Sequence, residues 1–394
     1  MIYLDNNATT KVDEKVLESM MPYFTEEYAN PSSIYDFSKK SSRAIKEARG
    51  VIKDFINAND EKEIIFTSCG SESANTAIKG VLNYNKAKKH IVTTKVEHPC
   101  VLNVYKSLEK HGYKVDYLSV NSNGDLDLEE LDSVINPETA LVSIMWANNE
   151  TGVINPIKKV SEIIKSKNPD TKLFVDAVQV AGKIPMDVQE MGIDLLGISG
   201  HKFHAPKGVG ALYVNSKTMI TPLIIGGHQE RGKRAGTENV PYIVGMAKAA
   251  ELAQNALKYE LTEVKRLRDK LETNLLKNIY NARLNTAVTN RVPNTTNIGF
   301  EYVEGELILL HMSDLGICAS SGSACTSGSL EPSHVLRAMN VPFTAIHGSI
   351  RFSLSRYTTE KEVDFVCEKM PQIIEKITAI SPFQDELAAL KARK

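Results

Sequence analysis

One lysine stands in a run of small and polar residues that directly follows an apolar stretch. Lys202 lies within Ser199-Gly-His-Lys-Phe-His-Ala-Pro-Lys-Gly-Val-Gly210, after the apolar segment 194–198. An amine held rigid and partly dehydrated in such a setting can form an imine with an aldehyde. Because a free lysine is protonated at neutral pH, this chemistry requires burial to favour the neutral amine. A surface or phosphate-binding lysine is the alternative, and the flanking Ser199 and His201 favour the covalent role.

A carboxylate ends another apolar segment, 173–176, upstream of the lysine. Asp176 can pair with a protonated ring nitrogen, and Gln179 can donate a hydrogen bond to a phenolic oxygen of the same ring. A lysine and an acid with these roles are the minimum for pyridoxal 5'-phosphate (PLP) chemistry, in which the ring withdraws electrons from a substrate carbon. His98 also follows an apolar segment, and an imidazole there can stack on a flat ring and move protons. The alternatives are a helix cap for Asp176 and a structural role for His98.

The segment 67–75 reads as a strand end, a turn of small residues and the start of a helix. Free backbone N–H groups at a helix start favour a phosphate, and Ser71 can add a hydroxyl hydrogen bond. The simpler interpretation is an ordinary helix with Ser71 as its N-cap and Glu72 in its first turn. Taken alone, this segment favours the simpler interpretation.

A second stretch of small residues, 319–333, surrounds Cys325. Serine and glycine pack poorly in a core, so we expect this cysteine to be exposed on a mobile loop, as a nucleophile or sulfur carrier. An incidental thiol in a flexible linker is the alternative. The chain has five cysteines and no Cys-x-x-Cys pair, which argues against a disulfide framework or a structural zinc site. We expect most of the other thiols to be buried.

Arginine can clamp a carboxylate through two parallel hydrogen bonds, and Arg351 lies in the strand-like segment 348–353. A surface salt bridge is the alternative. The apolar neighbours of Arg351 argue against full exposure of its side chain.

The elements that must position these residues alternate between strands and helices from about residue 60 to residue 215. This order predicts a mostly parallel sheet covered by helices, with ligands bound outside the carboxyl ends of the strands. The segment 241–280 has one long helical pattern that we expect to contain a hinge. Beyond it we predict further elements at 296–300, 304–315, 348–353 and 360–380.

Length and composition limit the possible classes of protein. A chain of 394 residues with 42% apolar residues fits two domains with a sizeable core. The net charge of −1 gives no general attraction to nucleic acid or an anionic membrane. The sequence shows no signal peptide and no apolar run near the ~20 residues of a membrane helix, so we expect a cytoplasmic protein.

In their order along the chain, these motifs resemble the group I cysteine desulfurases, the nitrogen-fixation and iron–sulfur-cluster type within the class-V aminotransferases. The resemblance covers nearly the whole chain, and the Lys202 segment is most similar to the nitrogen-fixation branch. Its motifs are Tyr3–Thr10, Asn30–Ser33, 67–75, Glu97–Pro99, Asn148–Gly152, Asp176–Gln179, Ser199–Gly210, Gly226–Thr237, 319–333 and Arg351–Arg356.

The resemblance implies a homodimeric PLP enzyme of fold-type I and no metal. It implies a large domain of residues 16–255, and a small α+β domain of residues 1–15 and 256–394 that carries the cysteine loop, about 318–333. Lys202 would bind the cofactor covalently. The phosphate of the cofactor would contact Gly70, Ser71, Ser199 and His201, together with Thr237 of the neighbouring subunit. The ring of the cofactor would contact His98, Asn149, Asp176 and Gln179. The substrate would contact Asn149 and Arg351.

The implied reaction converts L-cysteine to L-alanine and leaves the sulfur as a persulfide on Cys325, with Lys202 and His98 as the other catalytic residues. The sulfur would pass to an acceptor or iron–sulfur scaffold protein. Two alternatives stay open: a selenocysteine lyase or other PLP-dependent lyase or transaminase, and a non-catalytic sulfur-carrier scaffold. The Cys325 loop argues against a plain transaminase, which needs no mobile thiol.

Overall fold

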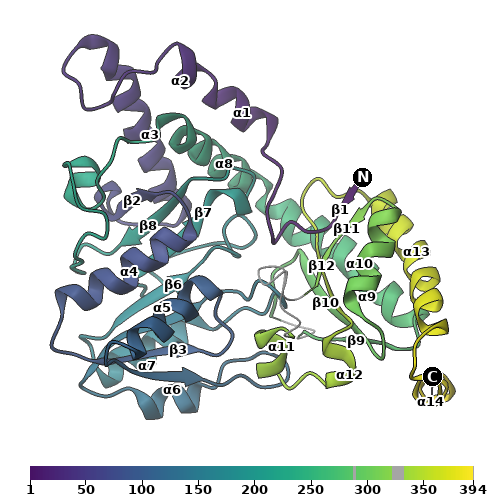
Figure 1. Cartoon of the computed structure of the whole chain (residues 1–394). Coiled ribbons are helices and arrows are strands. Elements are labelled where there is room, and N and C mark those ends of the chain that lie inside the picture. Colours follow the sequence, from purple (N-terminus) through teal and green to yellow (C-terminus); the bar gives the residue numbers. More distant parts are fainter. Residues whose placement is uncertain (287–289, 322–331, 394) are drawn as a thin grey trace.

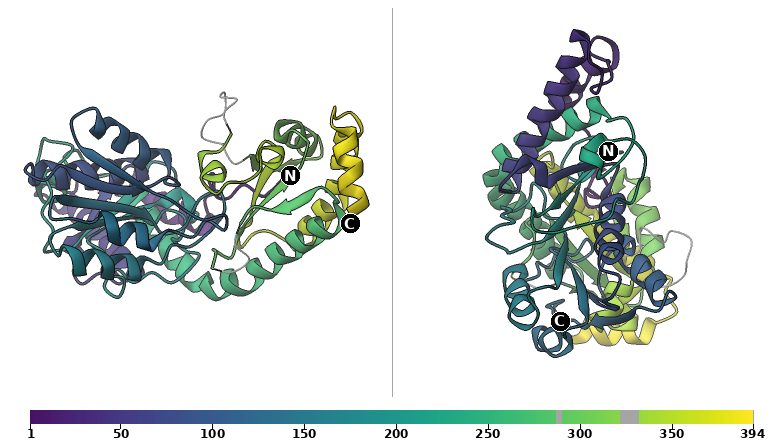
Figure 2. Two further views of the ribbon diagram at one scale, coloured as in Figure 1. Left: turned by 90° about the horizontal axis from the view of Figure 1, so that it is seen from below. Right: turned by 90° about the vertical axis from the view of Figure 1, so that its left-hand side faces the viewer.

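The computed structural model describes residues 1–286, 290–321 and 332–393, and their buried apolar residues form four clusters. The largest cluster, the larger core, covers one face of a seven-stranded sheet, and a third cluster covers its other face. The second largest cluster, the smaller core, packs around a four-stranded sheet. Figure 1 shows the two sheets beside each other, and the views in Figure 2 show a long helix that runs along both.

The seven-stranded sheet is mostly parallel, as the sequence predicted. Strand β8 runs antiparallel to both of its neighbours, β2 and β7, and the other pairings are parallel. Because β8 turns back against β7, the Lys202 segment is the short connection between these two strands. The sheet order is β2 (Ile64–Thr67), β8 (Gly210–Val214), β7 (Leu195–Ser199), β6 (Lys172–Asp176), β5 (Thr139–Met145), β3 (His90–Thr94) and β4 (Lys114–Leu118).

Helices cover both faces of this sheet because its strands are apolar on both sides. On β7, Leu196 faces the core shared with α3, α7 and α8, whereas Leu195 faces the core shared with α4 and α5. Such double burial is typical of parallel sheets. The helices are α1 (Glu14–Met20), α2 (Pro22–Thr25), α3 (Lys39–Phe55), α4 (Gly70–Tyr84), α5 (Pro99–Glu109), α6 (Leu128–Val134), α7 (Ile157–Lys167) and α8 (Val240–Tyr259).

The smaller sheet is antiparallel and contains strands from the last third of the chain, in the order β12 (Ser320–Ser321), β13 (Ser349–Ser353), β10 (Thr295–Phe300) and β9 (Ala282–Leu284). Beside it, β1 (Ile2–Tyr3) pairs in parallel with β11 (Ile317–Cys318), so the N-terminal strand lies with C-terminal elements. The remaining helices are α9 (Lys265–Asn278), α10 (Gly305–Asp314), α11 (His334–Ala338), α12 (Phe343–Ile346), α13 (Glu360–Ala379) and α14 (Gln384–Arg393).

The long helical pattern at 241–280 forms α8 and α9, which are joined by a π-helical turn at Glu260–Val264. Residues of α8 lie in the larger core and residues of α9 in the smaller one. Glu260, the first residue of the π turn, is buried between them. Within the part of the chain that the structure describes, no helix is long and apolar enough to cross a membrane.

Candidate active site

A cavity of about 260 Å³ lies at the carboxyl ends of the central strands. It contains every residue that the sequence analysis assigned to the cofactor within one subunit. Its lining residues are Ala8, Cys69, Gly70, Ser71, His98, Cys100, Met145, Asn149, Asp176, Val178, Gln179, Ser199, His201 and Lys202.

The amine of Lys202 is held against the N-terminal segment. Lys202 ends a short 3-10 turn after β7, and its Nζ donates to the backbone oxygens of Asn7, at 2.5 Å, and Ala8, at 2.8 Å. The backbone N–H of Thr10 donates to the carbonyl oxygen of His201 at 2.9 Å, which fixes the N-terminal segment on the Lys202 turn. No local sequence pattern placed Asn7 and Ala8 at this site, because they are 195 and 194 positions away from Lys202.

Asp176 is the last residue of β6, and its carboxylate is buried in the cavity wall. Its Oδ1 accepts the backbone N–H of Val178 at 2.9 Å, and the Cys100 thiol lies 3.9 Å from its Oδ2. A turn follows rather than a helix, so the helix-cap alternative is wrong. Burial raises the pKa of Asp176, while His98 and Lys202 oppose the rise. A cation beside Asp176 would therefore stabilise its ionised form.

His98 is both a structural residue and a wall of the cavity. Its Nδ1 accepts the backbone N–H of Cys100 at 3.2 Å, which makes it the N-cap of α5. Burial lowers the pKa of His98, so the ring is neutral at pH 7. Since Nδ1 is an acceptor in this contact, the neutral ring carries its proton on Nε2.

The start of α4 differs from the expected cap. The N-cap is Cys69 and the helix begins at Gly70, so the interpretation of Ser71 as N-cap is wrong. Ser71 lies in the first turn and is exposed toward the cavity. A Cβ at Gly70 would lie 3.0 Å from Cγ2 of Val178, which leaves little room for a side chain there.

Two further groups near this helix start suit an anion. The Oγ of Ser199 is buried and has no hydrogen-bond partner among the described residues. Burial and the charge of Lys202 lower the pKa of His201 to about 4, so its ring is a neutral hydrogen-bonding group. An unpaired buried hydroxyl is costly, and the free N–H groups of a helix start attract anions. A phosphate therefore fits this end of the cavity.

Gln179 and Asn149 also line the cavity, and both are held by Asn7. The side-chain amide of Gln179 donates through Nε2 to the backbone oxygen of Asn7 at 3.1 Å. The backbone oxygen of Asn149 accepts from Nδ2 of Asn7 at 3.1 Å. One residue of the N-terminal segment thus positions two residues of the cavity wall.

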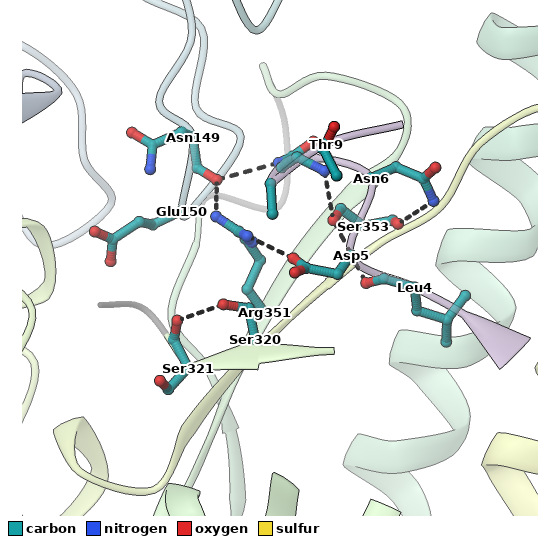
Figure 3. A network of polar contacts seen from close by, with 12 residues as sticks. Leu4, Asp5, Asn6, Thr9, Asn149, Glu150, Ser320, Ser321, Arg351 and Ser353 are labelled. Atoms are coloured by element: carbon teal, nitrogen blue, oxygen red, sulfur yellow. Dashed lines mark hydrogen bonds and ion pairs between the residues drawn. The ribbon is translucent and has the colours of Figure 1, made fainter. Parts of the chain in front are cut away.

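Arg351 lies beside the cavity, on β13, and its side chain is only 3% exposed. Figure 3 shows its guanidinium between Asp5, 2.6 Å from Nη2, and the backbone oxygen of Asn149, 3.0 Å from Nη1. The surface salt-bridge alternative is therefore wrong. Among the described residues, neither Arg351 nor the exposed Thr237 lines the cavity.

Cys325 lies outside the described residues. Of the other cysteines, Cys367 is buried, whereas Cys69, Cys100 and Cys318 are partly exposed, so the expectation that most of them are buried is wrong. Cys69 and Cys100 line the cavity itself. Burial, together with the negative charge of Asp176, raises the pKa of the Cys100 thiol far above its ordinary value, which makes it a poor nucleophile.

Comparison with known proteins identifies close relatives. The profile of the aminotransferase class-V family matches residues 2–366. The cysteine desulfurase of Nostoc sp. is 56% identical, over 100% of this chain and 98% of its own. The cysteine desulfurase NifS of Azotobacter vinelandii is 49% identical, over 97% of this chain and 94% of its own. A solved NifS-like protein superposes with a TM-score of 0.90 at 40% identity, over 95% of this chain and 99% of its own.

Proposed function

The chain belongs to the aminotransferase class-V family, and from that premise we propose how its residues carry out a PLP-dependent cysteine desulfurase reaction. The activity itself follows from relatives at 49–56% identity over nearly the full chain. They are cysteine desulfurases, which disfavours both the lyase or transaminase alternative and the non-catalytic scaffold. The roles of individual residues are our proposal. One observation carries it: Lys202, Asp176, Gln179, His98 and Ser199 line a single cavity.

The residues of the cavity fit PLP. When bound, the cofactor supplies an aldehyde that links to amines and a ring that withdraws electrons from the α carbon of the amino acid. Ser199, His201, Gly70 and Ser71 would hold its phosphate, because that end offers an unpartnered hydroxyl and free helix N–H groups. The phosphate contact of Thr237 would come from a second subunit.

The ring would lie between polar groups from separate strands. Asp176 would keep a proton on the ring nitrogen, since a buried carboxylate is stabilised by a neighbouring cation. Gln179 and Asn149 would donate to the ring oxygen, and His98 would cover one face of the ring.

Substrate binding and proton transfer use the remaining groups. Arg351 would bind the carboxylate of L-cysteine, together with Asn149, because the two residues are already in contact. The Lys202 amine, displaced by the substrate amine, would take the α proton and return it. His98 would assist as a proton donor, since its neutral ring carries an N–H at Nε2 while its Nδ1 is occupied by the N–H of Cys100.

The sulfur step balances without an external oxidant. The Cys325 thiolate would attack the substrate sulfur, forming a sulfur–sulfur bond while the carbon–sulfur bond breaks, and the substrate carbon would gain a proton to give L-alanine. The products are L-alanine and a Cys325 persulfide. The described residues on either side of this segment support the assignment, because they contact residues at or next to the proposed substrate contacts. Ser320 pairs with Arg351 across β12 and β13, and Ser333 donates to Glu150, the neighbour of Asn149, at 2.5 Å.

We further propose a cytoplasmic homodimer that delivers sulfur to an acceptor or iron–sulfur scaffold protein. The two cores support a large domain of residues 16–255 and a small domain of residues 1–15 and 256–394. The N-terminal strand β1 packs with the smaller core, which is why residues 1–15 are assigned to it.

The test is L-cysteine turnover with mass spectrometry of the protein. We expect L-alanine to form and one added sulfur atom to map to Cys325. The Cys325→Ala variant should keep the coloured cofactor and lose turnover, whereas Cys318→Ala, at a partly exposed thiol in β11, should keep both. Full activity of Cys325→Ala would refute the nucleophile assignment. Turnover of selenocysteine without turnover of cysteine would favour the lyase alternative.

A further inference from the structure

A second lysine is buried directly behind the cavity. Lys183 follows β6 by a short turn and is 6% exposed. Its Nζ donates to Oε1 of Gln179 at 2.9 Å and to Oδ1 of Asn7 at 3.2 Å. Lys183 is absent from the cavity lining. Any effect that it has on a ligand there through hydrogen bonds must therefore pass through these two amides, whereas its charge can also act through space.

The contact with Gln179 decides which end of this amide faces the ligand. A lysine ammonium has three donors and no acceptor, so only the amide oxygen of Gln179 can face it. The NH₂ end then points away from Lys183, toward the backbone oxygen of Asn7 and the cavity. The backbone oxygen of Asn7 accepts only from the NH₂ end and favours the same orientation, so loss of Lys183 would weaken this preference by one of its two contacts.

The same cation fixes the orientation of Asn7. Its Oδ1 accepts from Lys183 and from Nδ2 of Asn294, so its NH₂ group faces the other way, toward the backbone oxygen of Asn149 and Oγ1 of Thr295. Lys183 thus helps to orient both amides, and Asn294 contributes at Asn7.

The groups around Lys183 determine the pKa of its amine. Burial and the neighbouring Lys202 and Arg351 lower the pKa of Lys183 to about 7, and the buried carboxyl of Glu260 on the π turn opposes them. With a pKa of about 7, about half of this side chain is an ammonium at pH 7, and two amide oxygens accept hydrogen bonds from that form.

We propose that Lys183 is a positioning residue that makes Gln179 a hydrogen-bond donor toward the ring oxygen of PLP. This inference rests on the proposed function, which places Gln179 at that oxygen. A donor at the ring oxygen draws electron density away from it, and so weakens its hold on the proton of the nitrogen that Lys202 shares with the cofactor. Lys183 would in this way lower the pKa of the nitrogen shared by Lys202 and the cofactor without contacting that nitrogen.

The experiment compares the holoenzyme with Lys183→Met, Gln179→Ala and the double variant. Two quantities are measured: the affinity of the cofactor-free protein for PLP, and the pH midpoint of the visible absorption of bound PLP. We expect Lys183→Met to weaken PLP binding about tenfold and to raise the midpoint by about one pH unit, the effect of one lost hydrogen bond. Because the effect passes through Gln179, the double variant should match Gln179→Ala.

A matched control separates this role from general destabilisation. Lys165 is less buried than Lys183 but is likewise bound to two oxygens, the backbone oxygen of Thr171 and a carboxylate oxygen of Asp194. Lys165→Met should leave the PLP affinity and the midpoint unchanged. If Lys183→Met does not fold, Lys183→Gln keeps a polar end in its place and should shift both quantities in the same direction by less.

The outcomes distinguish a failure of the proposed contact between Gln179 and the ring from a failure of the positioning role of Lys183. If Gln179→Ala changes neither quantity, the proposed contact of Gln179 with the ring fails. If Gln179→Ala changes both and Lys183→Met changes neither, the positioning role of Lys183 is refuted. A full effect of Lys183→Met in the Gln179→Ala background would show that Lys183 acts by its charge alone, and would also refute the role proposed here.

Discussion

The carboxylate of Asp5 lies 2.6 Å from Nη2 of Arg351, so the arginine beside the cavity already has a carboxylate partner. Nη1 of the same guanidinium donates to the backbone oxygen of Asn149. Nε of Arg351 has no hydrogen-bond partner among the described residues. The guanidinium is therefore fixed at two nitrogens and retains donor capacity for a further acceptor.

Arg351→Lys should raise the KM for L-cysteine about 100-fold with a smaller effect on kcat, because lysine lacks the planar pair of donors. Asp5→Asn should raise KM by about fivefold, because the guanidinium keeps its place but loses an ionic contact. Steady-state kinetics of the two variants check this order. An unchanged KM in Arg351→Lys would remove Arg351 from substrate binding.

Ser199→Ala should separate cofactor binding from protein stability. The Ser199 hydroxyl is buried without a partner among the described residues, so its removal should leave the melting temperature of the cofactor-free protein unchanged or higher. PLP affinity should fall about tenfold if this hydroxyl binds the phosphate. Calorimetry and PLP titration measure the two effects. A variant that binds PLP as tightly as the parent would exclude the contact.

Glu97→Gln should flatten the pH dependence of stability. Burial raises the pKa of Glu97 to about 8, and its Oε2 has no hydrogen-bond partner among the described residues. The folded state thus favours the neutral carboxyl, and the resulting stability is complete below the unfolded pKa and is lost as pH rises through about 8. The parent should lose on the order of 4 kcal/mol relative to Glu97→Gln over this range. Chemical denaturation of both proteins at pH 5 and pH 9 gives the difference, and parallel pH profiles would contradict it.

Lys202→Ala should abolish the covalent link to PLP. Borohydride reduction followed by peptide mapping should place the cofactor on Lys202 in the parent and on no peptide of the variant. Lys207→Ala, in the same segment, is the control and should keep the label on Lys202. A label on another lysine of the parent would move the covalent role to that residue.

The sequence alone predicted the central sheet and the approach of Lys202, Asp176 and Ser199 because these features are local. Each residue directly follows an apolar strand, and parallel strands end at one edge of a sheet. The antiparallel turn of β8 escaped prediction because an apolar run has no direction.

The contacts between segments that are far apart along the chain could not be predicted from the sequence. Asp5, Asn7 and Lys183 act through partners on other elements, and no local pattern names those partners. The start of α4 was predicted wrongly because a local residue preference pointed to a cap that the backbone does not use. Serine is the preferred cap by type, but the helix is capped two residues before Ser71, at Cys69.

The N-terminal segment has a consequence for biosynthesis. Asn7 contacts Ser353, 346 positions later, and Thr295, 288 positions later, while its backbone oxygen receives the Lys202 amine. During translation, Asn7 leaves the ribosome long before either of those partners exists. We therefore expect that a nascent chain with the central sheet assembled still lacks the contacts that hold Asn7 behind the lysine, and that vitamin B6 is captured late in synthesis.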